Sequence, residues 1–131
     1  MKKEGKLIII TGDLTYRSAY SLFPAFNNII DLNSFHPLQF KECLLDILES
    51  IKNGSEILLI INSDVAISIL NNILITDSEN YPLNIIKLYE VNKFEMKEIS
   101  FGKLGYEIEW MNGFLNNLFE ETLEIQEKIS E

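Results

Sequence analysis

The chain has 131 residues, of which 47% are hydrophobic and 24% are charged, a balance that fits one folded domain over residues 1–131 and excludes a disordered segment. Its formal net charge of −9 repels phosphate backbones, and no cluster of lysine and arginine interrupts the acidic balance, so we expect no direct nucleic-acid binding. The single cysteine excludes an internal disulfide and the apolar runs are only strand-length, so we expect a soluble, cytoplasmic protein that does not enter a membrane.

Strands and helices alternate in the first half of the chain. Runs of aliphatic and β-branched residues predict strands at residues 6–11, 28–32 and 56–62. Apolar spacings of three and four predict a helix at residues 14–23 and a second helix that opens at Pro37 and ends at a left-handed cap, Asn53-Gly54. A third helix follows the cap residues Ser63-Asp64, and its predicted buried face uses Val65, Ile69, Ile73 and the neighbouring leucines.

Antiparallel features are predicted for the second half. Residues 85–91 and 94–101 are expected to pair as a hairpin, and residues 102–105 form a further turn. Tyr106, Ile108 and Trp110 alternate with glutamates, which predicts one more half-buried strand before a terminal amphipathic helix at residues 114–129.

These elements together predict an α/β fold. We expect a mainly parallel sheet with helices on both faces, in the layout of a P-loop NTPase, followed by antiparallel C-terminal edge strands and the terminal helix. Ligands of such sheets bind beyond the carboxyl ends of the strands, so the loops at residues 11–18, 31–36 and 62–64 form the candidate site.

The loop after the first strand has the place of a phosphate loop but not its chemistry. A working loop needs a second glycine, a lysine and a hydroxyl for magnesium, and here Arg17, Ser18 and Ala19 stand at those spacings. The residues left for weak nucleotide binding at the strand ends are Gly12, Asp13, Arg17, Ser18 and Asp31. We expect no catalytic residue, no bound metal and no cofactor, and a plain strand-to-helix turn is the competing interpretation of this loop.

Three segments in order resemble one known family. Residues 29–37 read Ile-Ile-Asp-Leu-Asn-Ser-Phe-His-Pro, Asn62-Ser63 ends a later strand, and residues 110–115 read Trp-Met-Asn-Gly-Phe-Leu. They are similar to the Walker B segment, the switch strand and the last helix entry of the ABC-like predicted AAA ATPases related to the overcoming-lysogenization-defect proteins, which are associated with phage defence. The resemblance covers roughly residues 29–128 and implies an ATPase or nuclease as the protein partner, in a defence or DNA-repair assembly.

The departures from that family imply a catalytically silent form. Asp31 matches the Walker B aspartate only with a two-residue deletion before His36, and Leu32 then stands at the catalytic glutamate. Asn62 stands at the switch histidine, and the segment between Phe23 and Asn28 has no room for the signature insertion. Phosphoryl transfer depends on positioned charges, so these losses predict no ATP hydrolysis.

Individual polar residues have structural alternatives to a functional role. The only histidine, His36, precedes a helix proline and is expected to be a cap, and Cys43 is expected to be a buried, unreactive thiol. Asp13, Asp31 and Asp64 all follow strands and could converge on a magnesium ion, although a turn and a helix cap explain two of them equally well.

The terminal helix carries the predicted interaction residues, namely Trp110, Phe114, Leu118, Phe119 and Leu123. The alternative is that its apolar side packs on the sheet. We therefore carry forward three functions: a binding or scaffold subunit that forms an oligomer with itself or another chain, a nucleotide- or metal-binding sensor, and an acidic inhibitor of a nucleic-acid-binding protein.

Overall fold

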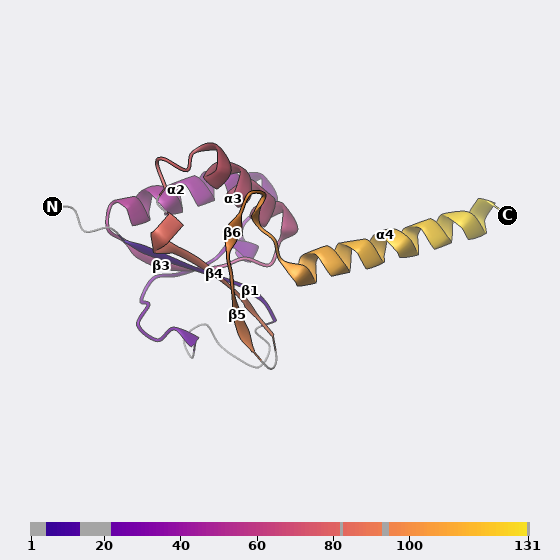
Figure 1. Cartoon of the computed structure of the whole chain (residues 1–131), viewed down its shortest axis with the longest axis horizontal. Coiled ribbons are helices and arrows are strands. Elements are labelled where there is room, and N and C mark those ends of the chain that lie inside the picture. Colours follow the sequence, from indigo (N-terminus) through magenta and orange to yellow (C-terminus); the bar gives the residue numbers. More distant parts are fainter. Residues whose placement is uncertain (1–4, 14–21, 82, 93–94, 131) are drawn as a thin grey trace.

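A twisted sheet with strand β1 at its centre organises the fold (Figure 1). The computed structural model describes residues 5–13, 22–81, 83–92 and 95–130, and within the last range it describes side chains for residues 95–108 and 117–129. The five strands lie in the order β2-β3-β1-β4-β5, and their bounds are β1 Lys6–Gly12, β2 Ile29–Asp31, β3 Glu56–Ile60, β4 Ile86–Val91 and β5 Met96–Ile99.

The pairing of these strands confirms the predicted sheet. Strands β2, β3, β1 and β4 run parallel, and β5 pairs antiparallel with β4 at the edge. In the register of the centre, Ile9 lies opposite Leu59 on one side and Leu88 on the other. All three side chains are fully buried, as the continuous aliphatic runs require of strands covered on both faces.

Helices α2 (Phe40–Lys52) and α3 (Asp64–Thr76) lie together on one face of the sheet (Figure 1). Short 3-10 turns precede α2 and β4; they are η1 Leu32–Ser34, η2 Pro37–Gln39 and η3 Leu83–Ile85. Gly54 has φ +106° after the end of α2, which confirms the predicted left-handed cap. Ser63 caps α3, with its Oγ accepting a hydrogen bond from the Ala66 N–H at 3.3 Å.

The buried face of α3 differs from the prediction at Val65. That side chain is exposed and Ile69 is half-buried, while the helix buries Ala66, Ile67, Leu70, Ile73 and Leu74. Apolar residues surround almost the whole helix, so their spacing does not determine which side meets the sheet.

The opposite face of the sheet is covered in the described part by aromatic side chains. Phe26 is buried against Ile8, Ile10, Leu58 and Val91, with Leu22 and Phe23 packed beside it. The helix predicted at residues 14–23 lies almost wholly outside the described residues, so the described helices α2 and α3 represent one of the two predicted layers.

The strand predicted at Tyr106, Ile108 and Trp110 is wrong beyond Tyr106. Strands β6 (Phe101–Gly102) and β7 (Gly105–Tyr106) form a separate small hairpin, and helix α4 (Glu109–Ser130) begins five residues before the predicted start. Tyr106 and Ile108 are buried and Glu107 is exposed, as alternation requires, but residues 107–108 pair with no described strand. Alternation over so few residues cannot distinguish an extended connection from a paired strand.

A side-chain clamp attaches this connection to α3. Asn71 accepts a hydrogen bond from the Tyr106 N–H at 2.8 Å and donates one to the Tyr106 carbonyl at 3.0 Å. Gly105 has φ +86° and a Cβ there would overlap the Asn71 side chain, so glycine is required. The clamp fixes the point at which the chain leaves the sheet layers and enters α4.

Helix α4 projects away from the sheet and its covering helices (Figure 1). Every described side chain of residues 117–129 is exposed. None of the described helices combines the length and the hydropathy needed to cross a bilayer.

Candidate functional site

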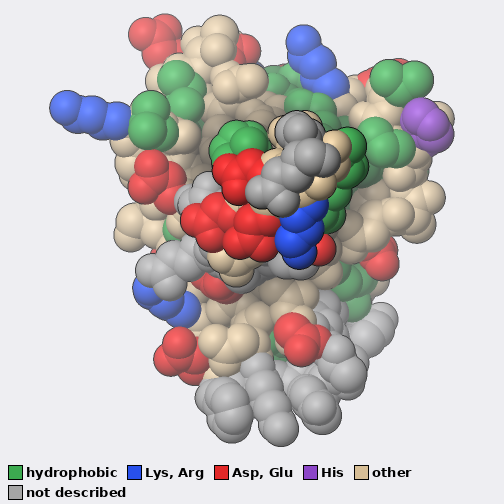
Figure 2. Space-filling model, turned by 90° about the vertical axis from the view of Figure 1, so that its right-hand side faces the viewer, with side chains coloured by type: hydrophobic (Ala, Val, Ile, Leu, Met, Phe, Trp, Pro, Cys, Tyr) green, Lys and Arg blue, Asp and Glu red, His purple; other side chains and the backbone are tan. Residues whose placement is uncertain are grey.

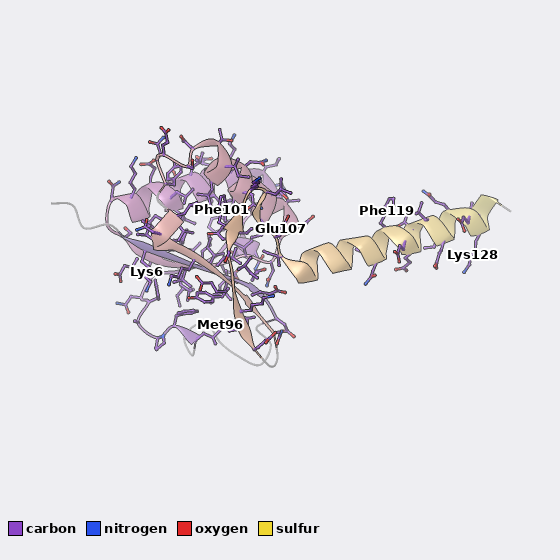
Figure 3. The ribbon with its side chains drawn as sticks, in the orientation of Figure 1. Lys6, Met96, Phe101, Glu107, Phe119 and Lys128 are labelled. Atoms are coloured by element: carbon purple, nitrogen blue, oxygen red, sulfur yellow. The ribbon has the colours of Figure 1, made fainter. Side chains whose placement is uncertain are left out.

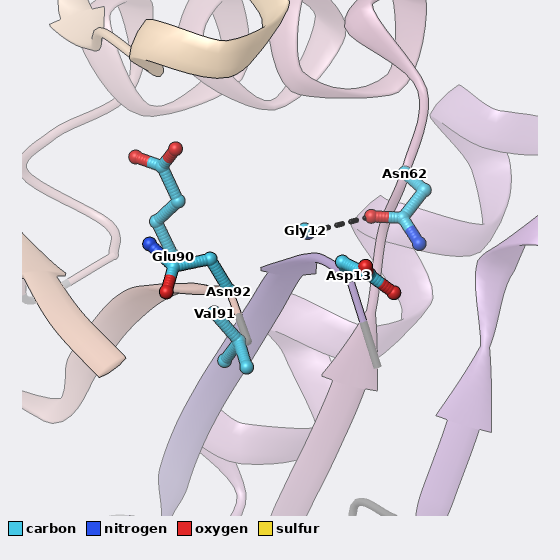
Figure 4. A pocket seen from close by; sticks show the side chains of 6 residues that line it. All are labelled: Gly12, Asp13, Asn62, Glu90, Val91 and Asn92. Carbon is cyan, nitrogen blue, oxygen red and sulfur yellow. Dashed lines mark hydrogen bonds between the residues drawn. The ribbon is translucent and has the colours of Figure 1, made fainter. Parts of the chain in front are cut away.

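The first candidate site lies at the carboxyl ends of β1 and β4. The chain leaves β1 toward β2 on one side of the sheet and leaves β4 toward β5 on the other, so its connections diverge between these neighbours. Such a switch point is where open α/β sheets bind ligands. A pocket of about 430 Å³ lies there, lined by Gly12, Asp13, Asn62, Glu90, Val91 and Asn92 (Figure 4).

Close approach of β1 and β4 explains why glycine stands at position 12. Gly12 has φ +114°, and a Cβ at this position would overlap the Val91 carbonyl oxygen. The next residue completes the junction, because the Asp13 N–H donates to the same Val91 oxygen at 2.8 Å. The glycine that sequence reasoning assigned to a phosphate loop is therefore required by the packing of two strands.

Asn62 connects the ends of three strands. Its Oδ1 accepts from the Gly12 N–H at 2.8 Å (Figure 4) and from Thr11 Oγ1 at 3.3 Å. Its own N–H donates to Asn33 Oδ1 at 3.0 Å, and the Asn33 N–H donates to Asp31 Oδ1 at 3.0 Å. Side-chain oxygens thus satisfy backbone donors from β1 across β3 to the end of β2.

Because of these hydrogen bonds, the backbone N–H groups at the start of the turn are not available to a triphosphate. A phosphate loop directs free backbone N–H groups at its ligand, whereas the N–H groups of Gly12 and Asp13 are already bonded. Among the described residues that line the pocket, Asp13 and Glu90 carry carboxylates and no lysine or arginine is present. The described lining therefore repels polyanions.

The structure brings together only part of the predicted site. Gly12 and Asp13 line the pocket, and Arg17 and Ser18 lie outside the described residues. Asp31 is not among the lining residues, since it ends the edge strand β2 and accepts the Asn33 N–H as the cap of η1.

No group of three or more histidine, cysteine or acidic side chains within the described ranges could hold a metal ion. The convergence of Asp13, Asp31 and Asp64 on magnesium is therefore not supported. Asp31 accepts a backbone hydrogen bond and Asp64 occupies the first turn of α3.

Sequence reasoning missed the contribution of β4. Glu90, Val91 and Asn92 line the pocket because β4 lies directly beside β1, although β4 comes after three other strands in the chain. A signal was present: Asn92 follows an apolar strand, and its Oδ1 accepts the Glu95 N–H at 2.9 Å in the turn to β5. Sheet order, which local patterns do not encode, decides that this turn belongs to the site.

The lone histidine and the lone cysteine have structural roles. His36 Nδ1 accepts the Leu38 N–H at 3.1 Å and caps η2, which confirms the predicted cap. Cys43 is half-buried, and burial together with the nearby Asp46 carboxylate raises the pKa of its thiol. A raised pKa keeps the thiol protonated and weakly nucleophilic.

The second candidate surface is on α4. Its apolar side chains are exposed to the following fractions: Leu118 44%, Phe119 65%, Leu123 43%, Ile125 50% and Ile129 78%. We call these five residues the α4 apolar face; the side chains of Trp110 and Phe114 lie outside those described. The alternative that this side of the helix packs on the sheet is therefore wrong for residues 117–129.

The α4 apolar face consists of two stripes along one half of the helix. Leu118, Ile125 and Ile129 follow at spacings of seven and four and form one stripe; Phe119 and Leu123, four apart, form the second, and Thr122 and Gln126 lie between them. Figure 3 shows side chains of α4, with Phe119 and Lys128 labelled, extending where no other described element covers them.

Comparisons with protein-family models, with curated proteins and with solved structures gave no match to this chain.

Proposed function

We propose that this chain is a non-catalytic, ATPase-like binding subunit that docks on a larger protein through α4. The observation that carries the proposal is the exposure of the α4 apolar face, whose five side chains are each at least 43% exposed. Clustered exposed apolar side chains mark protein interaction sites. Apolar side chains on one side of a helix are the usual anchors when a helix lies in a groove of another protein.

The length of α4 suits this role. Its 22 residues extend about 33 Å at 1.5 Å per residue, comparable with the width of a small domain. Isolated helices are only marginally stable in water, and contact with an apolar surface stabilises them. A partner that covers the α4 apolar face would therefore both bind the chain and order the helix.

Bonding at the sheet edge supports the non-catalytic part of the proposal. Asn62 occupies the Gly12 N–H and Val91 occupies the Asp13 N–H, where a nucleotide would need donors. The resemblance to the overcoming-lysogenization-defect related ATPases directs the search for a partner to ATPases and nucleases encoded beside this chain.

Light scattering after size exclusion tests the docking. The chain is purified together with the products of neighbouring genes, as wild type and as the triple variant Leu118→Ser, Phe119→Ser, Leu123→Ser. We expect a heteromeric mass for the wild type and a monomer for the triple variant. The matched control is Leu38→Ser with Leu104→Ser, which removes leucines that are 88% and 73% exposed outside α4 and should leave the complex intact. A lone monomer in every pairing would remove the proposal.

The pocket at the switch point is the observation behind a second candidate, a nucleotide- or metal-binding sensor, although its acidic lining disfavours a polyanion. Its volume of about 430 Å³ is sufficient for a small molecule. Calorimetry with ATP, GTP and magnesium decides between the two. The docking proposal expects no heat and no thermal shift at millimolar ligand, whereas micromolar binding lost in Asp13→Ala would favour the sensor.

A further inference from the structure

Acidic side chains border the α4 apolar face along both of its edges. On a helix with 100° between residues, Glu120 and Glu127 fall next to Leu123, and Glu121 falls next to Ile125. Glu124 lies between these borders on the opposite side. Residues 117–129 hold four glutamates and one lysine, Lys128, so their net charge is −3. Figure 2, which looks at the molecule from the side toward which α4 points, shows acidic side chains gathered near the centre of the view.

Two polar residues, Thr122 and Gln126, lie within the face. Thr122 lies beside Leu118, Ile125 and Ile129, and its Oγ1 donates to the Leu118 carbonyl at 2.9 Å within the helix. A hydroxyl that is bonded to its own backbone can be covered at little desolvation cost. A partner can therefore cover Leu118, Ile125 and Ile129 without leaving the Thr122 hydroxyl unbonded.

Charge disfavours a second copy of this chain as that partner. If two copies of α4 packed face to face, two segments of net charge −3 would come together and their glutamate borders would lie close to each other. Lys128 is the only cation of residues 117–129 that would offset this repulsion. Like charges at such positions destabilise helix pairs. A membrane surface is disfavoured for the same reason, because helices that lie on anionic lipid carry lysine and arginine on the polar face.

We infer that the α4 apolar face binds a basic amphipathic helix of a different protein, with lysine or arginine flanking its apolar side. This inference rests on the proposed docking function and adds the chemistry of the partner. Apolar contact supplies the adhesion, and the glutamate borders select cationic neighbours and raise the rate of association.

Fluorescence anisotropy with two synthetic helical peptides tests the inference on the full chain. Both peptides carry the same leucine face, one flanked by lysines and the other by glutamates. We expect the leucine–lysine peptide to bind at least about tenfold tighter than its glutamate counterpart, with an affinity that falls as salt increases. Glu120→Gln with Glu127→Gln should weaken binding about threefold or more and flatten the salt dependence. Phe119→Ser with Leu123→Ser should abolish binding, and Leu38→Ser should leave it unchanged.

The outcomes distinguish a failure of this inference from a failure of the docking function on which it rests. Equal affinity for both peptides, lost in the Phe119→Ser and Leu123→Ser variant, would overturn the basic partner but keep docking through α4. Binding of the lysine peptide that survives that variant would show attraction to acidic surface elsewhere and overturn the inference. Sedimentation of the chain as a dimer that the same variant dissociates would make a second copy the occupant. Binding of neither peptide, with no heteromer in any co-purification, would overturn the docking function itself.

Discussion

The sheet with its covering helices and the projecting helix α4 use the same kinds of side chain in opposite ways. In the sheet, Ile9 and Leu59 face each other across neighbouring strands and are fully buried. In α4, Leu118 and Ile129 repeat at helical spacing and are 44% and 78% exposed. Apolar patterning thus identifies both regions, but only the arrangement in space separates side chains that stabilise the fold from side chains that remain available to a partner.

The two regions also differ in how their hydrogen bonds are made. At the carboxyl edge of the sheet, Asn62 and Val91 satisfy the backbone donors of the turn after β1. The backbone donors of that region are therefore bonded within the chain. Helix α4 makes its interactions along its own length, as with Thr122 and Leu118, and leaves its apolar face uncovered.

Truncating one leucine in each region gives the largest expected contrast. Leu59→Ala should lower the free energy of unfolding by about 3 kcal/mol, because it removes a fully buried side chain and leaves a cavity. Leu123→Ala in α4 should change it by less than about 0.5 kcal/mol. Urea denaturation measures both, and equal losses would show that α4 is packed in the folded chain.

Gly12→Ala should give the next largest effect. A Cβ would overlap the Val91 carbonyl at a backbone φ of +114°, so we expect a loss of about 2 kcal/mol. The matched control is Gly102→Ala, since a Cβ there has its nearest described neighbour at 3.8 Å. If the two substitutions cost the same in thermal unfolding, the close approach of β1 and β4 is not what requires glycine.

Asn62→Ala should follow, with a loss of about 1–2 kcal/mol. It removes the acceptor of the Gly12 N–H and leaves a backbone donor without its bond. Asn72→Ala, on the exposed side of α3, removes the same side chain outside this network and should be nearly neutral. A neutral Asn62→Ala in denaturant titrations would contradict the assignment of Asn62 as the residue that closes the sheet edge.

The smallest effect concerns pH. Burial, with a contribution from the Glu98 carboxylate, raises the pKa of Tyr106 to about 12. Unfolded tyrosine loses its proton near pH 10, so the stability that Tyr106 contributes is complete below about pH 10 and is lost as the pH rises toward 12. In Tyr106→Phe, unfolding free energy should fall less steeply over this range than in the wild type. Parallel pH curves for the two proteins would refute this.

Sequence patterns were sufficient where local chemistry decides the structure. The aliphatic run before Gly12, the cap at Ser63 and the glycine at position 54 each act within a few residues, and the structure has the strand, the helix start and the helix end there. Local patterns do not determine the order of the strands in the sheet. Glu90 and Asn92 reach the pocket only because β4 lies beside β1, and the bond from Gly12 to Asn62 joins residues 50 apart in the chain.

The errors have the same origin. Val65 was assigned to a buried face because apolar residues surround α3, and Trp110 was assigned to a strand because two preceding residues alternate. The sequence leaves open whether α4 packs on its own sheet, because an amphipathic pattern indicates that the apolar side is covered but not by which surface.

Hydrogen exchange of the α4 amides tests the central claim most directly. The account predicts that amides of residues 117–129 exchange orders of magnitude faster than those of β1 and β3 in the isolated chain, and become protected in the co-purified assembly. Protection of α4 equal to that of the central strands in the isolated monomer, or no change on assembly, would contradict docking through this helix.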